Sequence, residues 1–115
     1  MVACDIHPLN NLRVRRYLAR ELALDEAAQQ AWYAHWGRLG LEAIEAVLAR
    51  AGTHRYCCGP VPTLADCALV PQVVNLQRFG VSLDGLPTVM AVFDACMALP
   101  AFQRAHPSAR VLGGA

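Results

Sequence analysis

The stretch from Pro62 to Phe79, PTLADCALVPQVVNLQRF, constrains the fold of this chain most strongly. Thr63 precedes Asp66 by three positions, which is the spacing of a helix-start capping box. In that motif the threonine hydroxyl accepts an N–H of the first turn, and the carboxylate accepts the N–H of the threonine. The following positions are apolar nearly all round a helix, so we expect a helix buried on most sides that bends at Pro71. We assign Thr63 and Asp66 to folding, as a structural N-cap.

Helical spacing of apolar residues recurs along the rest of the chain, and no stretch has the alternation and turn signals of a β-hairpin. The expected helices cover approximately residues 9–24, 25–51, 63–79, 88–98 and 101–106. We expect residues 1–7 to be an irregular lead-in and residues 107–115 to be a tail. The sequence therefore predicts a single all-α domain, a bundle of four to five helices.

The longest expected helix has two apolar stripes, so we expect it to pack on more than one neighbour. One stripe contains Trp32 and Trp36, one turn apart, which is more typical of a core than of a ligand platform. Gly37 and Gly40 each cost about 1 kcal/mol against alanine in a helix interior. Their presence indicates the close approach of a neighbouring element or a bend.

Charge and cysteine usage exclude several classes of protein. A formal net charge of +1 gives no general attraction to nucleic acid or to an acidic membrane. The cysteine count is odd and no C-x-x-C motif occurs, which argues against a disulfide framework or a zinc site. Cys67 and Cys96 lie on apolar stripes, where thiols are usually inert core residues. With no secretory signal and no membrane-spanning run, we expect a cytoplasmic protein.

The residues alone contain no complete catalytic apparatus. The histidines are scattered without metal-ligand spacing, and no phosphate loop, dinucleotide glycine pattern or nucleophile elbow occurs. Arg13, Arg16 and Arg20 share one face of the first expected helix. That face is either a solvated surface or a wall that faces an anion, because arginine binds carboxylates through two parallel hydrogen bonds.

Four segments carry a resemblance to a known family: CDIHPLNNLRV, HWGRLGLEAIEAVL, PTLADCALVPQVVNLQRFGVSL and LPAFQRAHPS. Together they resemble the C-terminal helical domain of zeta-class glutathione transferases, in particular bacterial maleylacetoacetate or maleylpyruvate isomerases. The resemblance extends over almost the whole chain, from Cys4 to Ser108. Its most specific parts are the I-H-P-L-N-N opening and the string that runs from L-V-P-Q-V to R-F.

The resemblance implies a glutathione-dependent cis–trans isomerase of aromatic amino acid catabolism that converts maleylacetoacetate or maleylpyruvate to the fumaryl product. The glutathione thiolate adds to the double bond, the resulting single bond rotates, and elimination follows. A Ser/Cys-rich motif of an N-terminal thioredoxin-like domain activates the thiolate, and the family enzyme is usually a homodimer. That domain is not in this chain, so we expect no catalytic residue here and no activity of the chain alone.

By position, the resemblance makes His7, Asn11, Leu12 and Arg13 candidates for glutathione binding. It makes Arg78 a candidate for binding the acidic substrate, together with Arg13. These assignments are chemically reasonable, since a dicarboxylate requires cationic donors and arginine stays charged when partly buried.

A second hypothesis is a stand-alone helical module that binds a protein partner or an acidic ligand without catalysis. Without the thioredoxin-like half, the first and third expected helices would expose apolar patches that seek a partner. A nucleic-acid-binding module is opposed by both the charge balance and the motifs.

Overall fold

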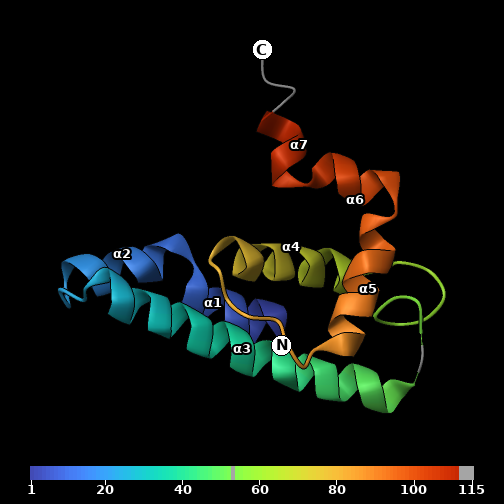
Figure 1. The fold of residues 1–115 in the computed structure, drawn as a ribbon, viewed down its shortest axis with the longest axis horizontal. Helices are drawn as coiled ribbons and strands as arrows, with labels where there is room; N and C mark the ends of the chain where they lie inside the picture. The colour runs from blue at the N-terminus through green and yellow to red at the C-terminus, as the bar shows by residue number, and fades with distance from the viewer. Residues whose placement is uncertain (53, 112–115) are drawn as a thin grey trace.

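The computed structural model of the chain describes residues 1–52 and 54–111. All regular structure in that part is helical, which confirms the predicted fold class. The elements in chain order are a π-helical turn Val2–Ile6 (η1), α1 (His7–Asn10), α2 (Leu12–Arg20), α3 (Glu26–Ala51), α4 (Leu64–Arg78), α5 (Pro87–Met97), α6 (Pro100–Ala105) and α7 (Pro107–Val111). Figure 1 shows α1, α2 and α4 alongside the long α3, whereas α5 stands across them at one end and leads into α6 and α7.

The core lies between α3, α4 and α5, where Leu41, Val73 and Val89 are completely buried. The two glycines of α3 allow this close packing. A β-carbon at Gly37 would overlap the side chain of Leu76 in α4, and one at Gly40 would overlap Ile6 in η1. The close approach predicted from these glycines is therefore confirmed at both positions.

The predicted capping box at the start of α4 is present. Asp66 Oδ2 accepts the N–H of Thr63 at 2.8 Å, and Thr63 Oγ1 accepts the N–H of Ala65 at 3.3 Å. Beyond the prediction, Asp66 Oδ1 accepts the N–H of Cys57 at 2.9 Å and the thiol of Cys96 at 3.7 Å. This buried carboxylate therefore joins α4 to the preceding loop and to α5.

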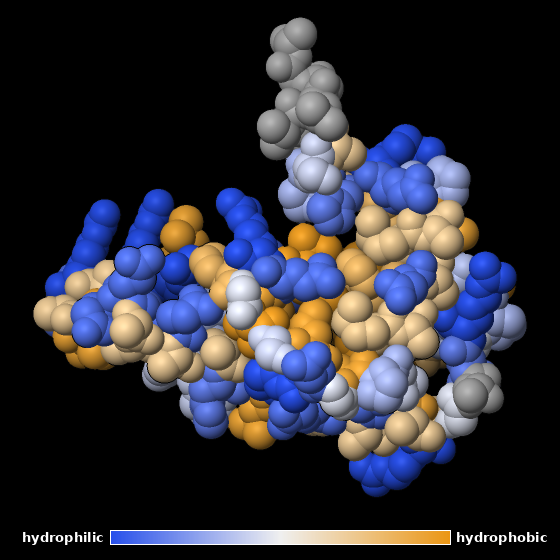
Figure 2. Space-filling view, viewed as in Figure 1, coloured by the Kyte–Doolittle hydropathy of each residue, from blue (hydrophilic) through white to orange (hydrophobic). Residues whose placement is uncertain are grey.

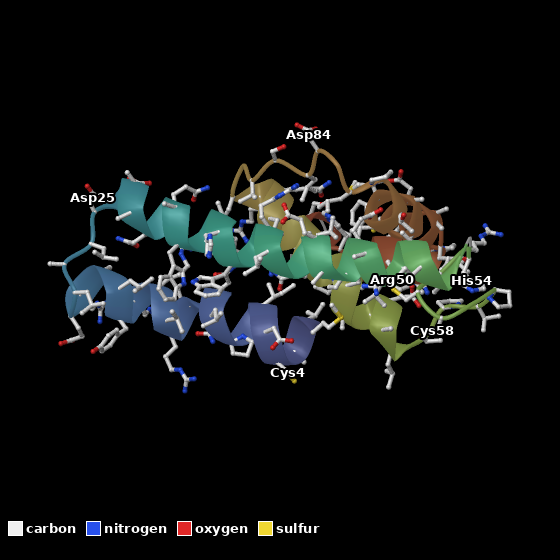
Figure 3. All side chains as sticks on the ribbon, turned by 90° about the horizontal axis from the view of Figure 1, so that it is seen from below. Cys4, Asp25, Arg50, His54, Cys58 and Asp84 are labelled. Atoms are coloured by element: carbon white, nitrogen blue, oxygen red, sulfur yellow. The ribbon has the colours of Figure 1, made fainter. Side chains whose placement is uncertain are left out.

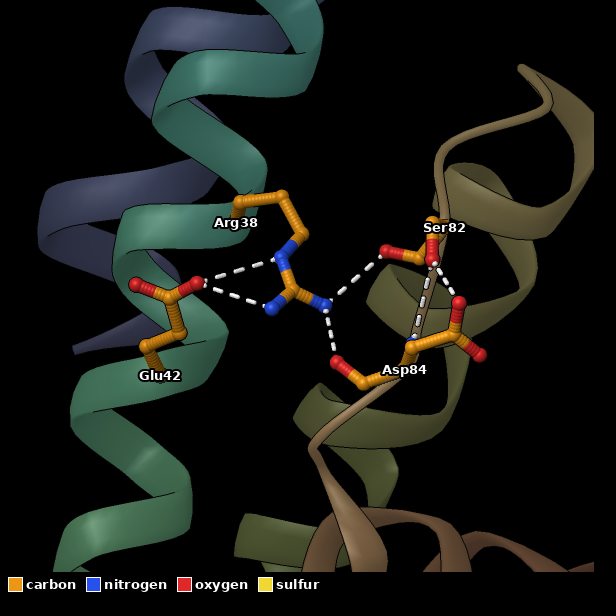
Figure 4. A network of polar contacts seen from close by, with 4 residues as sticks. All are labelled: Arg38, Glu42, Ser82 and Asp84. Atoms are coloured by element: carbon orange, nitrogen blue, oxygen red, sulfur yellow. Dashed lines mark hydrogen bonds and ion pairs between the residues drawn. The ribbon is translucent and has the colours of Figure 1, made fainter.

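The long helix also fixes the connection between α4 and α5. Glu45 of α3 accepts the N–H groups of Thr88 and Val89 at 2.9 and 2.7 Å, so it caps the first turn of α5. Arg38 donates to the carbonyl oxygens of Ser82 and Asp84 and forms an ion pair with Glu42 at 2.8 Å (Figure 4). The loop that follows α4 is thereby held against α3.

The N-terminal part differs from the prediction in two ways. Residues Val2–Ile6, expected to be irregular, form a π-helical turn, and the burial of Ile6 beside Gly40 of α3 holds this turn against the long helix. The expected helix over 9–24 is also divided at Asn11 and ends at Arg20. Asn11 has an extended backbone. Its Oδ1 accepts the N–H of Val14 at 3.0 Å, and its Nδ2 donates to the carbonyl oxygen of Pro8 at 3.1 Å. The asparagine thus ends one helix and caps the next.

The prediction of a tail over residues 107–115 is wrong for its first five residues. Residues Pro107–Val111 form α7, since a proline at the first position of a helix has the required φ and lacks only an N–H that would be unbonded anyway. Residues 112–115 of that predicted tail lie outside the described residues.

The two cysteines predicted on apolar stripes have different environments. Cys96 is buried as expected, but Cys67 is exposed, because the buried side of α4 is occupied by its neighbour Asp66. Figure 3 places Cys4 at the N-terminal helical turn and Cys58 in the loop after α3, away from each other. All cysteine thiols are free.

The first apolar stripe of α3 is only partly covered. Trp32 and Trp36 are half-buried, with ring centroids 5.8 Å apart, and Trp32 Nε1 donates to the carbonyl of Leu9 at 2.9 Å. Further along the same stripe, Leu39 and Val47 are 51% and 47% exposed. The stripe therefore begins against α1 and continues as an open surface.

Candidate functional site

A polar hollow of about 390 Å³ opens where α1 ends and α2 begins, opposite the C-terminal half of α4. The break at Asn11 turns the chain there, so that side chains from both short helices point into the same space. The long α3 and the end of α4 close the other sides. The lining residues are His7, Asn10, Asn11, Leu12, Arg15, Tyr33, Gln72, Asn75, Arg78 and Phe79.

The hollow is electropositive, since its lining contains two arginines and no Asp or Glu. Neither Arg15 nor Arg78 forms an ion pair with a carboxylate in the part of the chain that the structure describes. The guanidinium carbon of Arg15 lies 4.3 Å from the ring centroid of Phe79 and 5.7 Å from that of Tyr33. Burial raises the pKa of the Tyr33 phenol, although the charges of both arginines oppose this effect. Such a site suits an anion.

Three buried side-chain polar atoms in the described residues have no hydrogen-bond partner, and all three belong to the lining of this hollow. They are Asn10 Oδ1, Arg15 Nε and Gln72 Nε2. Asn10 is only 8% exposed and Gln72 only 3% exposed. Buried polar groups in proteins are nearly always hydrogen-bonded, so three exceptions at one place make this hollow a candidate binding site.

The structure brings together most of the site residues predicted from the sequence. His7, Asn11, Leu12 and Arg78 all line the hollow, whereas Arg13 is exposed and lies outside it. Arg15 occupies the corresponding position inside. Residues two positions apart on an α-helix point about 200° apart, so only one of these two arginines can face the hollow.

Several lining residues were not predicted from the sequence, among them Asn10, Arg15 and Gln72. A usable signal exists for Gln72, because this amide interrupts the apolar residues that surround it on α4. Thr63 and Asp66 lie at the opposite end of α4 from the hollow, which agrees with their assignment to folding.

A second hollow of about 240 Å³ lies beside the first, between α4 and the two C-terminal helices. Its lining is mostly apolar and includes Val70, Val74 and Phe102. Asn75 lines both hollows, so they adjoin on the same side of α4. Figure 2 shows hydrophobic residues gathered along α4, in the angle that it forms with α5 and α6.

The described residues contain neither a metal site nor a membrane-spanning helix. No three histidine, cysteine or acidic side chains lie close enough to hold a metal ion. No helix there is both long enough and apolar enough to cross a bilayer.

Comparison with known proteins places the chain in a family. The glutathione S-transferase C-terminal domain family matches residues 30–103. The maleylpyruvate isomerase of Ralstonia sp is 49% identical over 113 residues, which covers 96% of this chain and 52% of that protein. A solved holo structure of maleyl pyruvate isomerase, a bacterial zeta-class glutathione S-transferase, has a TM-score of 0.91 at 50% identity, over 94% of this chain and 51% of that one.

A further solved structure is that of the maleylacetoacetate isomerase from Methylobacterium extorquens with bound malonate and GSH. It has a TM-score of 0.88 at 36% identity, and the similarity covers 92% of this chain and 50% of that one. The chain spans about half the length of the curated relatives it matches. The predicted resemblance to the zeta-class isomerases is confirmed, and the chain belongs to the glutathione S-transferase C-terminal domain family.

Proposed function

We propose that this chain is the substrate-side helical half of a glutathione-dependent cis–trans isomerase that acts on maleylacetoacetate or maleylpyruvate. The observation that carries the proposal is the hollow with two arginines and no carboxylate, in a chain whose relatives are named as these isomerases. A dicarboxylate substrate needs two cationic partners in a site without competing negative charge. The relative from Methylobacterium extorquens was solved with such a dicarboxylate, malonate, together with GSH.

In this proposal Arg78 binds a carboxylate of the substrate at the rim of the hollow. His7, Asn11 and Leu12 form the side that approaches glutathione, and their imidazole, amide and apolar groups suit a small peptide. Arg13, exposed on the outer face of α2, would contact glutathione or substrate only from outside the hollow. Bound glutathione would supply the thiolate chemistry, while the residues of this chain bind and orient the acidic groups.

We further propose that a thioredoxin-like half covers the side of α4 on which the two hollows adjoin. The apolar hollow beside the polar one supports this, since exposed apolar surface of that kind favours a protein partner. The exposed part of the α3 stripe, with Leu39 and Val47, supports a homodimer. We also propose a cytoplasmic location, with which the free cysteines are consistent, and a role in aromatic amino acid catabolism, which rests on the resemblance to the zeta-class isomerases.

The test uses a fusion protein in which the N-terminal half of the Ralstonia isomerase precedes this chain. Arg78→Ala should raise the KM for maleylpyruvate about tenfold or more, because hydrogen bonds to charged groups contribute about 1.5–3 kcal/mol. Arg20→Ala is the matched control, since Arg20 is exposed and outside the hollow. An unchanged KM in the Arg78 variant would remove this residue from the substrate site.

The alternative function is a binding module without catalysis, and the presence of both arginines in this chain favours an acidic ligand for it. The same fusion protein separates the two. A folded fusion that binds glutathione and does not isomerise either substrate supports the binding module.

A further inference from the structure

We propose that Arg15 and Gln72 form an inner carboxylate site at the floor of the hollow, which binds one end of a small dicarboxylate while Arg78 binds the other. The inference deepens the proposed function, on which it rests for the class of the substrate. It assigns a binding role to two residues that the sequence analysis does not connect with any function.

Contacts with two aromatic rings fix the guanidinium group of Arg15 and leave its N–H donors available to an anion. Its guanidinium group lies over the ring of Phe79 at 4.3 Å and near Tyr33 at 5.7 Å. A guanidinium group has its five N–H donors in its own plane, so contact of its face with a ring leaves the donors at its edge free. No carboxylate of the described residues pairs with it, and its Nε is buried without an acceptor.

Gln72 supplies a second donor to the same space. Its Nε2 has no partner, although the residue is only 3% exposed. Gln72, Asn75 and Arg78 follow one another at three-residue intervals along α4, so each is next to the following one on the helix surface, and all three line the hollow. The amide therefore lies deeper in the hollow than the exposed Arg78.

Asn10 completes the floor as an acceptor. Its Nδ2 donates to the carbonyl of Tyr33 at 3.0 Å, which fixes its Oδ1 as the unpartnered atom. A bound hydroxyl group or a water molecule would satisfy this oxygen. Arg15 and Gln72 therefore provide two donors and one positive charge at the floor, which suits one carboxylate group. The second carboxylate of the ligand would then bind Arg78.

The fold therefore leaves three polar atoms unsatisfied in one place, where a bound carboxylate would pair two of them. Leaving buried donors unpaired destabilises a protein, so an apolar residue of similar shape at such a position should not reduce stability. This gives the inference a test that separates binding from folding.

The experiment measures malonate and acetate binding to this chain by calorimetric titration, and melting temperature in parallel. Arg15→Met should weaken malonate binding about tenfold or more, and should reduce the preference for malonate over acetate. Arg15→Lys keeps the charge but loses the planar fork, and should give an intermediate affinity. Arg16→Met, at an exposed position outside the hollow, is the control and should bind malonate as the unmodified chain does.

Gln72→Met removes the amide and keeps the approximate shape of the side chain. We expect weaker malonate binding, by about tenfold, with a melting temperature that is unchanged or higher. A purely structural role for Gln72 would instead lower the melting temperature and leave the malonate affinity unchanged.

The inference is overturned if the unmodified chain does not bind malonate, or if Arg15→Met and Gln72→Met both bind it normally. The fate of the proposed function is measured separately, as isomerase activity of the fusion protein. If the fusion is active but malonate binding does not depend on Arg15, the inner carboxylate site is refuted and the isomerase proposal stands. If the fusion folds and binds glutathione but is inactive, while malonate binding depends on Arg15, the isomerase proposal is refuted and the inner carboxylate site stands.

Discussion

The buried carboxylate of Asp66 should contribute more to the stability of this fold than an ordinary helix cap. It accepts the N–H groups of Thr63 and Cys57 at 2.8 and 2.9 Å, and it is completely buried. In Asp66→Ala both N–H groups would lose their acceptor, and each belongs to a partly buried residue. Each unpaired buried donor costs about 1–3 kcal/mol, so we expect a loss of roughly 2–6 kcal/mol in the free energy of unfolding.

Thr63→Ala should be milder, at about 0.5–2 kcal/mol, because its backbone N–H still donates to Asp66. The assay is urea unfolding followed by circular dichroism, with Asp94→Asn as the control, since Asp94 is exposed on α5. A loss below about 0.5 kcal/mol in Asp66→Ala would mean that neither N–H group depends on this carboxylate, because one unpaired buried donor costs about 1–3 kcal/mol.

The same residue predicts the direction of a pH effect. Burial raises the pKa of Asp66, but hydrogen bonds from Cys57 and Thr63 outweigh burial and hold the pKa below its ordinary value. The stabilisation is therefore complete above the unfolded-state pKa of about 3.9, and it is lost as the pH falls through the lower folded-state value. Asp66→Asn should remove this acid-dependent part of the unfolding free energy, whereas Asp94→Asn should keep it.

Two further predictions follow from packing and burial. Gly37→Ala should lower the free energy of unfolding by about 1–3 kcal/mol despite the better helix propensity of alanine, because the new methyl group overlaps Leu76; a raised unfolding midpoint would contradict this packing. In the native chain at pH 8, a thiol reagent should modify the exposed Cys4, Cys58 and Cys67 rapidly. It should modify Cys57 and Cys96 slowly, since burial raises the pKa of each to about 12, and equally fast reaction of all thiols would contradict that burial.

Local signals in the sequence predicted α3 and α4 and their packing, but not the division of the N-terminal helix or the helix after Pro107. Three signals can be recognised in short stretches of the sequence: the Thr63–Asp66 spacing, the apolar pattern of α3 and the two glycines of that helix. The structure contains the feature that each of them predicts, namely the capping box, the long helix and the close packing at both glycines. The second hydrogen bond of Asp66, to the N–H of Cys57, could not be predicted, since it depends on how the loop before α4 returns to the helix.

The candidate site was predicted only in part, because the direction of its side chains is set by one break. Asn11 caps α2 and thereby fixes which of the closely spaced arginines turns inward, and that residue is Arg15 rather than Arg13. In the continuous helix predicted over residues 9–24, nothing indicates which of these arginines would face the hollow. Similarly, the apolar residues all round α4 do not reveal which side is covered, so Cys67 was expected to be buried and is exposed.

Conversion of maleylpyruvate and maleylacetoacetate by the fusion protein decides whether this chain is half of a glutathione-dependent isomerase, as we propose. With glutathione present, we expect the fusion to convert at least one substrate to its fumaryl isomer, and this chain alone to convert neither. A folded fusion that binds glutathione and converts neither substrate faster than glutathione in buffer would mean that the chain is not part of such an isomerase.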